Sequence, residues 1–416
     1  MPSTSSLLRF ARFLVGSFVV GLGLATTAAR AQPLPLGGEI AVNTSTASFQ
    51  QSPHVGMSDA GAFMVVWSSG VLDGSGEGVF ARKFASNGTP FAEFGLNQVT
   101  VNDQSVPAIG MNASGDYVAA WQSVDQAAPG SGRDVYARRS SFSGSTLGNE
   151  FLANVDTVDF TGSTRAARSD DGTFVIGWEL NGAIFARRFD ASGAALTGDV
   201  AVTDSSLALA VAAAPAGSFV VVYNHPDSDG NGISARLYSA AGAPLGAAFP
   251  VPVSEVGQQQ KPAVGMDALG NFVVVWELFA SGIRARRFAA DGAALSGELA
   301  ISAPGFSGGS IAVDVAADGA FVVSWQSTRA DASGGIDAQE LQRTGVPVGG
   351  PFLVNTTVAG SQSSPAVATG KDQFVVVWES PDADSTGIFG QRFRRRVVFG
   401  DDLETGNLAA WSAVSP

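Results

Sequence analysis

The chain has 416 residues, of which 45% are hydrophobic and 15% charged, with 51 glycines, 19 prolines and no cysteine. Disulfides and thiolate metal sites are therefore excluded, and the many turn-forming residues favour short strands over long helices. A formal net charge of −13 argues against nucleic acid as a partner, because the phosphates would be repelled.

Residues 1–31 predict a secretory signal peptide. Arg9 and Arg12 precede the apolar run Phe13–Ala25, and Ala29-Arg30-Ala31 has the small-x-small pattern of a cleavage site. The run is shorter than the roughly 20 apolar residues that a membrane-spanning helix needs, and no later stretch is long enough either. We therefore expect an exported protein, secreted or at the bacterial cell surface, without a membrane span.

A repeat of about 50 residues runs through the rest of the chain. It reads P-x-V-G-M-x-x-x-G-x-F-V-V-V-W, a variable loop, G-V-x-A-R-R-F-x-x-x-G, and then L-G-x-E-F. The aromatic residue that ends the first segment, here called the anchor, recurs at Trp67, Trp121, Trp178, Tyr223, Trp276, Trp325 and Trp378. β-Branched and aromatic segments separated by glycines predict four antiparallel strands in each copy.

The second strand of each copy is apolar at nearly every position, as in Phe63–Trp67 and Phe272–Trp276. Alternate side chains of a strand face opposite sides of the sheet, so both faces must be buried, as between neighbouring blades of a propeller. Two series of glycines predict turns with positive φ. The first is Gly61, Gly115, Gly172, Gly217, Gly270 and Gly319, with Asp372 in the same place in the last copy, and the second is Gly88, Gly144, Gly193, Gly242, Gly292 and Gly345.

The two ends of the repeat array complement each other. Pro35–Ile40 matches the fourth strand of other copies, such as Leu295–Leu299, while the last copy loses the pattern after Phe393. We therefore predict an all-β fold, a seven-bladed β-propeller of four-stranded antiparallel blades whose last blade is closed by the N-terminal strand. The propeller would span 32–396 and a C-terminal tail 397–416; an open solenoid, the alternative, would leave both ends uncapped.

The loop between the second and third strands varies in length from copy to copy, which makes its face the predicted binding surface. Three of these loops carry oxygen ligands at alternate positions, a pattern that can wrap Ca²⁺, the one cofactor that the sequence suggests. The predicted ligands are Asp73, Ser75 and Glu77, then Asp227, Asp229 and Asn231, and finally Asp382, Asp384 and Thr386. Tyr238 stands where an EF-hand has its bidentate Glu, so solvated Asx-rich turns are the alternative.

Arginine recurs at one position of the third strand. The series is Arg82, Arg138, Arg187, Arg236 and Arg286, with Gln339 and Gln391 in the last two copies. A ring of guanidinium groups could capture anions, but we favour structural pairing across the strands. The predicted partners follow the anchor on the second strand: Glu179, Glu277, Glu379, Gln122, Gln326 and Asn224.

The chain offers few candidate catalytic residues, since it has two histidines and no cysteine. His54 stands where other copies have Ala108, Ala263 and Ala366, and His225 lies in an acidic loop. Neither histidine has a nucleophile or a second base near it in the pattern. Carboxylate pairs for glycoside cleavage stay open, because nothing in the sequence selects a pair. We therefore predict no catalytic residues.

The repeat resembles the uncharacterised extracellular bacterial repeat proteins whose copies read F-V-V-V-W and G-V-x-A-R-R-F over residues 35–393. The resemblance implies a propeller and carries no known activity. Residues 399–412 are similar to an F-x-D-D-F-E-x-G-x-L-x-x-W-S segment near the ends of many exported bacterial proteins. The D-x-D-x-D-G order of FG-GAP propellers is incomplete here, and the sialidase Asp-box pattern S-x-D-x-G-x-T-W is not reproduced.

These observations predict a monomeric, non-catalytic binding or scaffold protein that recognises glycan or protein through its variable-loop face. A polysaccharide-active hydrolase or lyase with carboxylates at the channel mouth is the alternative, and a purely structural spacer is a third.

Overall fold

The computed structural model describes residues 32–144, 148–155, 161–206, 208–254, 256–302, 309–328 and 334–396. The predicted signal peptide and the predicted C-terminal tail lie outside these residues. The described part is built of strands and turns, and it contains no helix that is long and apolar enough to cross a membrane.

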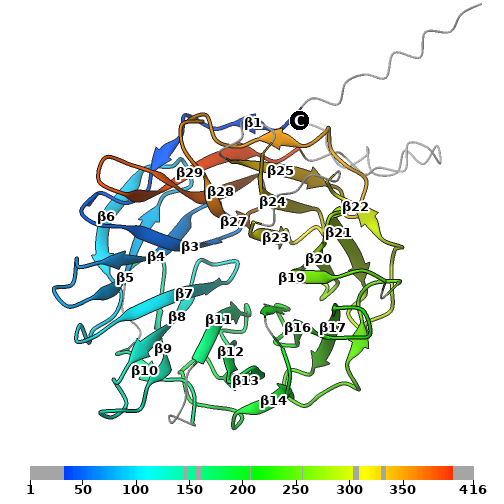
Figure 1. Ribbon diagram of the computed structural model, residues 1–416, viewed down its shortest axis with the longest axis horizontal. Coiled ribbons are helices and arrows are strands. Elements are labelled where there is room, and N and C mark those ends of the chain that lie inside the picture. The colour runs from blue at the N-terminus through cyan, green and yellow to red at the C-terminus, as the bar shows by residue number, and fades with distance from the viewer. Residues whose placement is uncertain are drawn as a thin grey trace, which may run out of the picture.

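Seven antiparallel sheets stand in a ring around a central channel (Figure 1). The chain builds one sheet after another, so each repeat is one blade. The strands of a blade follow one another in order from the channel to the perimeter. Blades 1 to 3 contain β3 (Gln50–Met57), β4 (Phe63–Gly70), β5 (Glu77–Phe84) and β6 (Pro90–Gly95); β7 (Gln104–Met111), β8 (Tyr117–Val124), β9 (Arg133–Ser140) and β10 (Phe151–Leu152); and β11 (Thr161–Arg168), β12 (Phe174–Leu180), β13 (Ala183–Phe189) and β14 (Val200–Thr203).

The remaining blades follow the same order. Blades 4 to 6 contain β15 (Leu209–Ala213), β16 (Phe219–Pro226), β17 (Asn231–Tyr238) and β18 (Phe249–Pro250); β19 (Gln259–Met266), β20 (Phe272–Leu278), β21 (Gly282–Phe288) and β22 (Leu299–Ala300); and β23 (Ile311–Val315), β24 (Phe321–Ser327), β25 (Gly335–Leu341) and β26 (Phe352–Leu353). Blade 7 contains β27 (Ser363–Thr369), β28 (Gln373–Pro381) and β29 (Thr386–Arg394), together with β1 (Leu34–Pro35) and β2 (Ile40–Ala41) from the N-terminal end.

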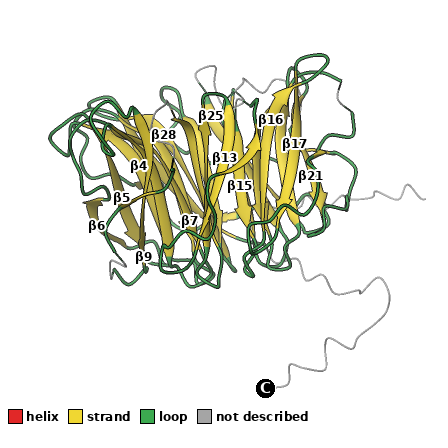
Figure 2. Cartoon of the chain, turned by 90° about the horizontal axis from the view of Figure 1, so that it is seen from below, coloured by secondary structure: helices red, strands yellow, loops and turns green. Residues whose placement is uncertain are grey.

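Apolar contacts between neighbouring blades form the core. Each cluster of buried residues joins two adjacent blades; one of them joins Val220 and Val222 of β16 to Val274 and Trp276 of β20. Figure 2 shows the strands of all blades standing between two layers of loops. Both faces of the second strands are therefore buried, as the unbroken apolar runs predict.

The N-terminal segment closes the ring. Ile40 and Ala41 pair with Gly390 and Phe389 of β29, and the backbone N–H of Val42 donates to the carbonyl of Ile388 at 2.8 Å. Val42 is buried in the cluster that joins blades 7 and 1. The predicted seven-bladed propeller and its closure by the N-terminal strand are confirmed, and blade 7 thereby gains its outer strand.

The turn geometry follows the glycines with one exception. Both glycine series have positive φ, between +82° and +95°. The prediction that Asp372 takes the same conformation is wrong, because it is not among the residues with positive φ. The turn of blade 7 is one residue shorter: Thr369 pairs with Phe374, whereas Met57 of blade 1 pairs with Phe63.

Candidate functional site

The loops between second and third strands form the adjustable face of the ring. In chain order they cover 71–76, 125–132, 181–182, 227–230, 279–281 and 382–385, while most of the corresponding loop of blade 6 lies outside the described residues. They lie beside the linkers that join one blade to the next, since the N–H of Asn102 in a linker donates to the hydroxyl of Ser75 at 3.3 Å. The face with variable loops therefore also carries the inter-blade linkers.

The first aspartate of each predicted calcium loop caps its own turn. Asp73 Oδ1 accepts the N–H of Ser75 at 3.2 Å, and Asp227 Oδ1 accepts the N–H of Asp229 at the same distance. Asp382 Oδ1 accepts the N–H groups of Asp384 and Ser385 at 3.1 and 2.9 Å. These contacts are Asx turns, which short polar side chains form without a metal.

The second oxygen of each pattern holds the linker to the next blade. Asp229 Oδ2 accepts the N–H of Gly257 at 2.8 Å, and Asp384 Oδ2 accepts the hydroxyl of Thr46 at 2.9 Å. Ser75 plays this part in blade 1 through Asn102. The alternating oxygens thus have partners of their own in the loop and in the linker.

The third positions lie at the starts of third strands. Glu77, Asn231 and Thr386 begin β5, β17 and β29, and burial together with nearby Asp103 raises the pKa of Glu77. Throughout the described ranges, no three His, Cys, Asp or Glu side chains come together as metal ligands would. Two carboxylate oxygens, Oδ2 of Asp227 and of Asp382, are buried without a hydrogen-bond partner. Calcium binding stays a prediction, now centred on these two oxygens.

The arginine series joins neighbouring blades, and the predicted partners on the second strand are wrong. Arg187 lies opposite Ile176, while Glu179 lies opposite Ile184. A guanidinium N–H of each arginine donates to a backbone carbonyl on the outer edge of the preceding blade. The pairs are Arg82 with Val42, Arg138 with Leu96, Arg187 with Ala153, Arg236 with Val202 and Arg286 with Val251, at 2.8 to 3.4 Å.

In four blades the residue after this position of the third strand is a cation that reaches the other way, to the following blade. Lys83 donates to Phe142, Arg139 to Ala191, Arg188 to Gly217 and Arg392 to Ser86, in each case to a carbonyl of a turn. Sequence reasoning missed this second contact, although the repeated Ala-Arg-Arg pattern is its signal. In blades 1 to 3 two neighbouring cations therefore fasten the blade on both sides.

Buried amides also join the blades at the linkers, and they too were not foreseen. Asn43 donates to Gln50 at 3.0 Å, Asn97 to Gln104 at 2.9 Å and Asn355 to Gln362 at 3.2 Å. The spacing of seven residues between Asn and Gln recurs in the sequence and could have shown the pairs. These side chains are structural and leave no polar group free for a ligand.

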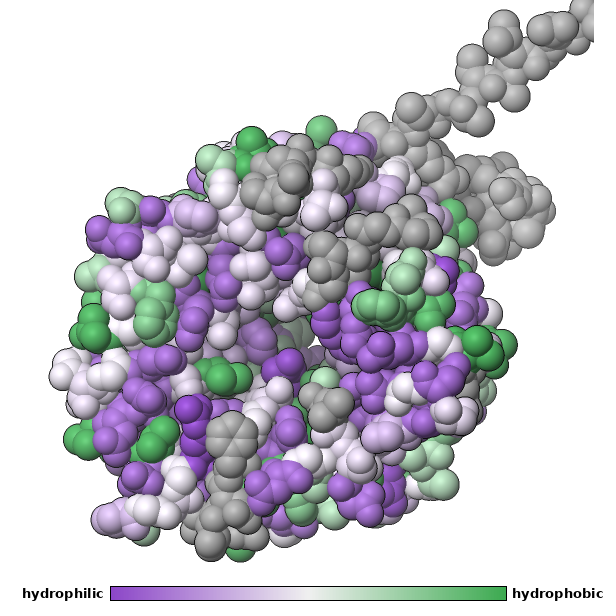
Figure 3. Space-filling view, in the orientation of Figure 1, coloured by the Kyte–Doolittle hydropathy of each residue, from purple (hydrophilic) through white to green (hydrophobic). Residues whose placement is uncertain are grey.

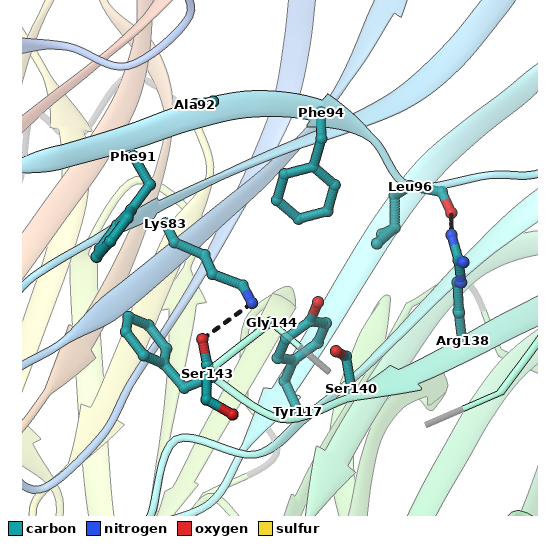
Figure 4. Close-up of a pocket in the computed structure, with 11 residues that line it drawn as sticks. Lys83, Phe91, Ala92, Phe94, Leu96, Tyr117, Arg138, Ser140, Ser143 and Gly144 are labelled. Carbon is teal, nitrogen blue, oxygen red and sulfur yellow. Dashed lines mark hydrogen bonds between the residues drawn. The ribbon is translucent and has the colours of Figure 1, made fainter. Parts of the chain in front are cut away.

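A cavity of about 510 Å³ opens on the flank between blades 1 and 2 (Figure 4). The Lys83 ammonium lies 5.3 Å from the ring centre of Tyr117 and 5.6 Å from that of Phe142. It also donates to the carbonyls of Ser141 and Phe142. The cation at this pocket is thus already held by the neighbouring blade, and we assign it to structure.

The central channel opens on the variable-loop face through a second cavity, of about 340 Å³, here called the channel mouth. Figure 3 shows the channel as a hollow at the centre of the ring. The first strands line it with small apolar residues and prolines. The polar side chains of its lining are Ser52, His54, Ser163, Arg165, Ser310 and Ser364.

His54 and Arg165 occupy the same position of the repeat. They pair with Val66 and Gly177, each directly before an anchor. The other five blades have alanine there: Ala108, Ala210, Ala263, Ala312 and Ala366. His54 is recognisable in the sequence as a substitution on the repeat, whereas the equivalent position of Arg165 becomes evident only from the strand register. Two large polar side chains therefore enter the channel at a level where five methyl groups leave room.

The electrostatics of the mouth differ from those of the rest of the protein. His54 and Arg165 are the only titratable groups among the described residues that line it, whereas the whole chain has a net charge of −13. Burial, together with the charge of Arg165, lowers the pKa of His54 to about 3. Burial also lowers the pKa of Arg165, yet a guanidinium stays charged. At neutral pH the mouth therefore carries one positive charge and a neutral imidazole.

Carboxylates on the rim of the mouth are bound to the chain. Glu379 accepts the N–H of Ser52 at 2.7 Å and the hydroxyl of Ser363 at 3.0 Å. Glu277 forms an ion pair of 3.2 Å with Lys261. Ser52 and Lys261 have positive φ at bulges of the first strands. These acids therefore fix the strained backbone at the entrance of the channel.

The opposite end of the channel is acidic. Asp59, Asp170, Asp267 and Asp314 line a cavity of about 350 Å³ together with Arg168. Asp314 accepts the N–H and the hydroxyl of Thr369 at 2.6 and 2.8 Å, and burial raises its pKa to about 6. The channel thus has a cationic and an anionic end.

Comparison with known proteins supports the fold. No known protein family matches the sequence, and no curated protein matches it either. The structure is similar to that of a protein of unknown function from Dyadobacter fermentans, with 12% identity, a TM-score of 0.53, and coverage of 88% of this chain and 99% of the other.

Two sialidases are among the other similar structures. The NanB sialidase from Streptococcus pneumoniae has 9% identity and a TM-score of 0.47, with 88% of this chain and 71% of the sialidase covered. The intramolecular trans-sialidase from Ruminococcus gnavus has 10% identity and a TM-score of 0.46, with 87% and 98% covered. At these identities the likeness extends to the fold alone.

Proposed function

We propose that this protein is an exported, non-catalytic binding protein of the secreted fraction or the cell surface, which recognises glycan or protein through its variable-loop face. One observation carries the proposal. Among the described residues, polar side chains with one partner or none line the channel mouth, at the centre of that face, whereas the carboxylates on the rim that are described above hold the backbone. A rigid ring with adjustable loops around a central pocket suits binding.

A glycan and surface-protein binding panel tests the proposal. Loops 71–76 and 125–132 would be shortened to the two-residue Asn181-Gly182 turn that already joins β12 and β13. We expect the shortened protein to lose binding at least about tenfold, because the contacts of two loops are removed. L269A is the matched control, since Leu269 is 78% exposed in a turn on the opposite face.

Unchanged binding after loop shortening would reject the proposal. Cooperative thermal melting shows whether the shortened protein folds. If it does not, the variant V71S keeps the loop length and replaces a side chain that is 62% exposed; it should then weaken binding where L269A does not.

A polysaccharide-active hydrolase is the second candidate, and Glu179 favours it. Burial raises the pKa of Glu179, while a hydrogen bond from the backbone of Ser163 opposes that shift. A carboxyl group with a raised pKa beside a channel is a candidate general acid. Release of reducing sugar from any polysaccharide of the panel, lost in E179Q, would establish hydrolysis in place of simple binding.

A further inference from the structure

Polar side chains that have few or no partners among the described residues gather in the channel mouth. Within the described ranges the His54 ring makes no hydrogen bond, and neither do the hydroxyls of Ser52, Ser163, Ser310 and Ser364. Arg165 donates one bond, to the carbonyl of Thr164 at 2.8 Å. A guanidinium has five N–H donors, so most of those of Arg165 face the cavity unused.

Arg165 also lacks a counter-charge. No carboxylate of the described residues pairs with it within 4.0 Å, in contrast to Arg395, whose guanidinium binds both oxygens of Asp318 at 2.8 and 2.9 Å. The Arg165 side chain is half-buried, and polar groups that are withdrawn from bulk water are normally satisfied. A bound oxyanion would supply the missing acceptor and the missing charge together.

The surroundings of Arg165 select against a cation and against a long polyanion. The lining of the mouth contains no acid, and the net charge of −13 repels extended negative chains. A volume of about 340 Å³ suits one sugar or a small organic acid. A single charged group at the end of a ligand therefore fits better than a charged polymer.

We propose that the channel mouth binds a single oxyanion, a carboxylate or a phosphate, with Arg165 as its charged contact and His54 and the serine hydroxyls as its hydrogen-bonding contacts. This inference rests on the proposed function, because it names the chemical group of the ligand that binds at the centre of the variable-loop face. The ligand contacts one guanidinium through charge-assisted hydrogen bonds, which are stronger than bonds between neutral groups.

Histidine NMR is the direct test, because the chain has only His54 and His225. In the variant H225A the C–H signals of a single histidine ring remain, and they report on the mouth. Acetate, inorganic phosphate and glucuronate are titrated separately. We expect a saturable shift of the His54 signal with at least one of them, and removing Arg165 in R165A should weaken binding about tenfold to a hundredfold.

Matched variants separate a local site from a change in net charge. R394A removes the same charge from an exposed position of β29 and should bind as the parent does. H54A should weaken binding by less than R165A, measured by calorimetry, because it removes a neutral contact. Both R165A and H54A introduce the alanine that five blades already carry. If R165A does not melt cooperatively, R165Q replaces it.

The three anions distinguish the source of the oxyanion. A response to glucuronate alone would identify a sugar acid, whereas equal responses to acetate and phosphate would identify free small anions; both support the site. The absence of a saturable shift up to about 100 mM, where salt screening becomes strong, would overturn it, as would an equal shift in R165A. The binding panel with shortened loops is scored independently, so that the proposed function can hold when this inference fails.

Discussion

Charged residues on the perimeter of the ring and in the channel mouth differ in what they contact. On the perimeter Arg187 follows the repeat and donates to Ala153 of the preceding blade at 2.9 Å. In the mouth Arg165 departs from the repeat, at a position where five blades have alanine, and donates a single bond to the neighbouring carbonyl of Thr164. The same side chain is thus structural where the pattern is kept and available to a ligand where the pattern is broken.

The contrast teaches how to search a repeat protein for function. Contacts that recur from blade to blade hold the blades together, so their residues are explained by stability. A polar residue that replaces alanine in a single copy takes no part in these recurring contacts. The free-energy cost of withdrawing it from water therefore needs another explanation. The predictions below separate the two kinds of residue by their effects on stability.

Opening the ring should have the largest effect. Deletion of residues 32–43 removes β1 and β2 and the buried Val42, which leaves blade 7 without its outer strand. We expect the free energy of unfolding to fall by about 5 kcal/mol or more, measured by urea denaturation. L269A is the control and should change little, because Leu269 is 78% exposed. An unchanged urea midpoint after the N-terminal deletion would show that the perimeter does not depend on closure.

Breaking one perimeter contact should have the next largest effect. R187M keeps the length of the side chain and removes the donors to Ala153 and Thr197, at 2.9 and 3.1 Å. Two carbonyls then lose their partner, and we expect a loss of about 2 kcal/mol in urea denaturation. The exposed Arg394 provides the control, because R394M should stay within about 0.5 kcal/mol of the parent. Equal effects of the two variants would contradict the assignment.

At one perimeter position, Glu340, we expect the free energy of unfolding to depend on pH. Glu340 replaces the second cation of the pattern in blade 6, and burial raises its pKa from 4.5 to about 7. The folded protein therefore binds a proton that the unfolded chain releases between these values, so stability from this group falls as pH rises from 4.5 through 7. E340Q should raise the free energy of unfolding at pH 8 by on the order of 1–2 kcal/mol and should change it little at pH 4. Stabilisation that is the same at both pH values would argue against a buried charge.

The mouth residues should change stability less. The pKa of His54 is about 3 in the folded protein, against 6.5 for a free histidine, so the unfolded chain takes up a proton as pH falls below 6.5 and stability declines towards pH 3. H54A should remove this decline, on the order of 1 kcal/mol at pH 5, and be near neutral at pH 8. R165A should raise the pKa of His54, because it removes a neighbouring positive charge. An unshifted His54 titration in R165A would separate the two side chains.

Calcium has the smallest expected effect. A single weak site adds about 0.4 kcal/mol of stability when the free ion concentration equals its Kd. The melting temperature should then rise slightly with CaCl₂ and fall with chelator, and D227N/D382N should respond to neither, because both buried Oδ2 atoms belong to these residues. A melting temperature that is indifferent to chelator in the parent protein would remove calcium from the account.

Much of the fold could be predicted because each structural position occurs in several copies of the repeat. The glycine at Gly61 has counterparts in five further blades, and so its positive φ could be inferred from position alone. The pairing of Ile40 with Gly390 followed from the missing strand at one end and the extra strand at the other. Asp372 was mispredicted since one deleted residue changes the turn type, which residue identity alone does not reveal.

The candidate site was harder to predict because it depends on contacts between blades. Glu179 and Arg187 are close along the blade pattern, yet strand register places them opposite other residues. His54 and Arg165 lie in separate copies, and only alignment of all first strands shows that they share one level. The third copy also lacks the proline that precedes this position in blade 1, and so its alignment with the other copies is less evident.

Crystals grown or soaked with selenate test the central claim most directly, since selenium gives anomalous scattering. We expect an anomalous peak in the channel mouth within hydrogen-bonding distance of the Arg165 guanidinium, absent from crystals of R165A. Peaks confined to surface arginines, with none in the mouth of the parent protein, would contradict the claim that the break in the repeat makes a binding site.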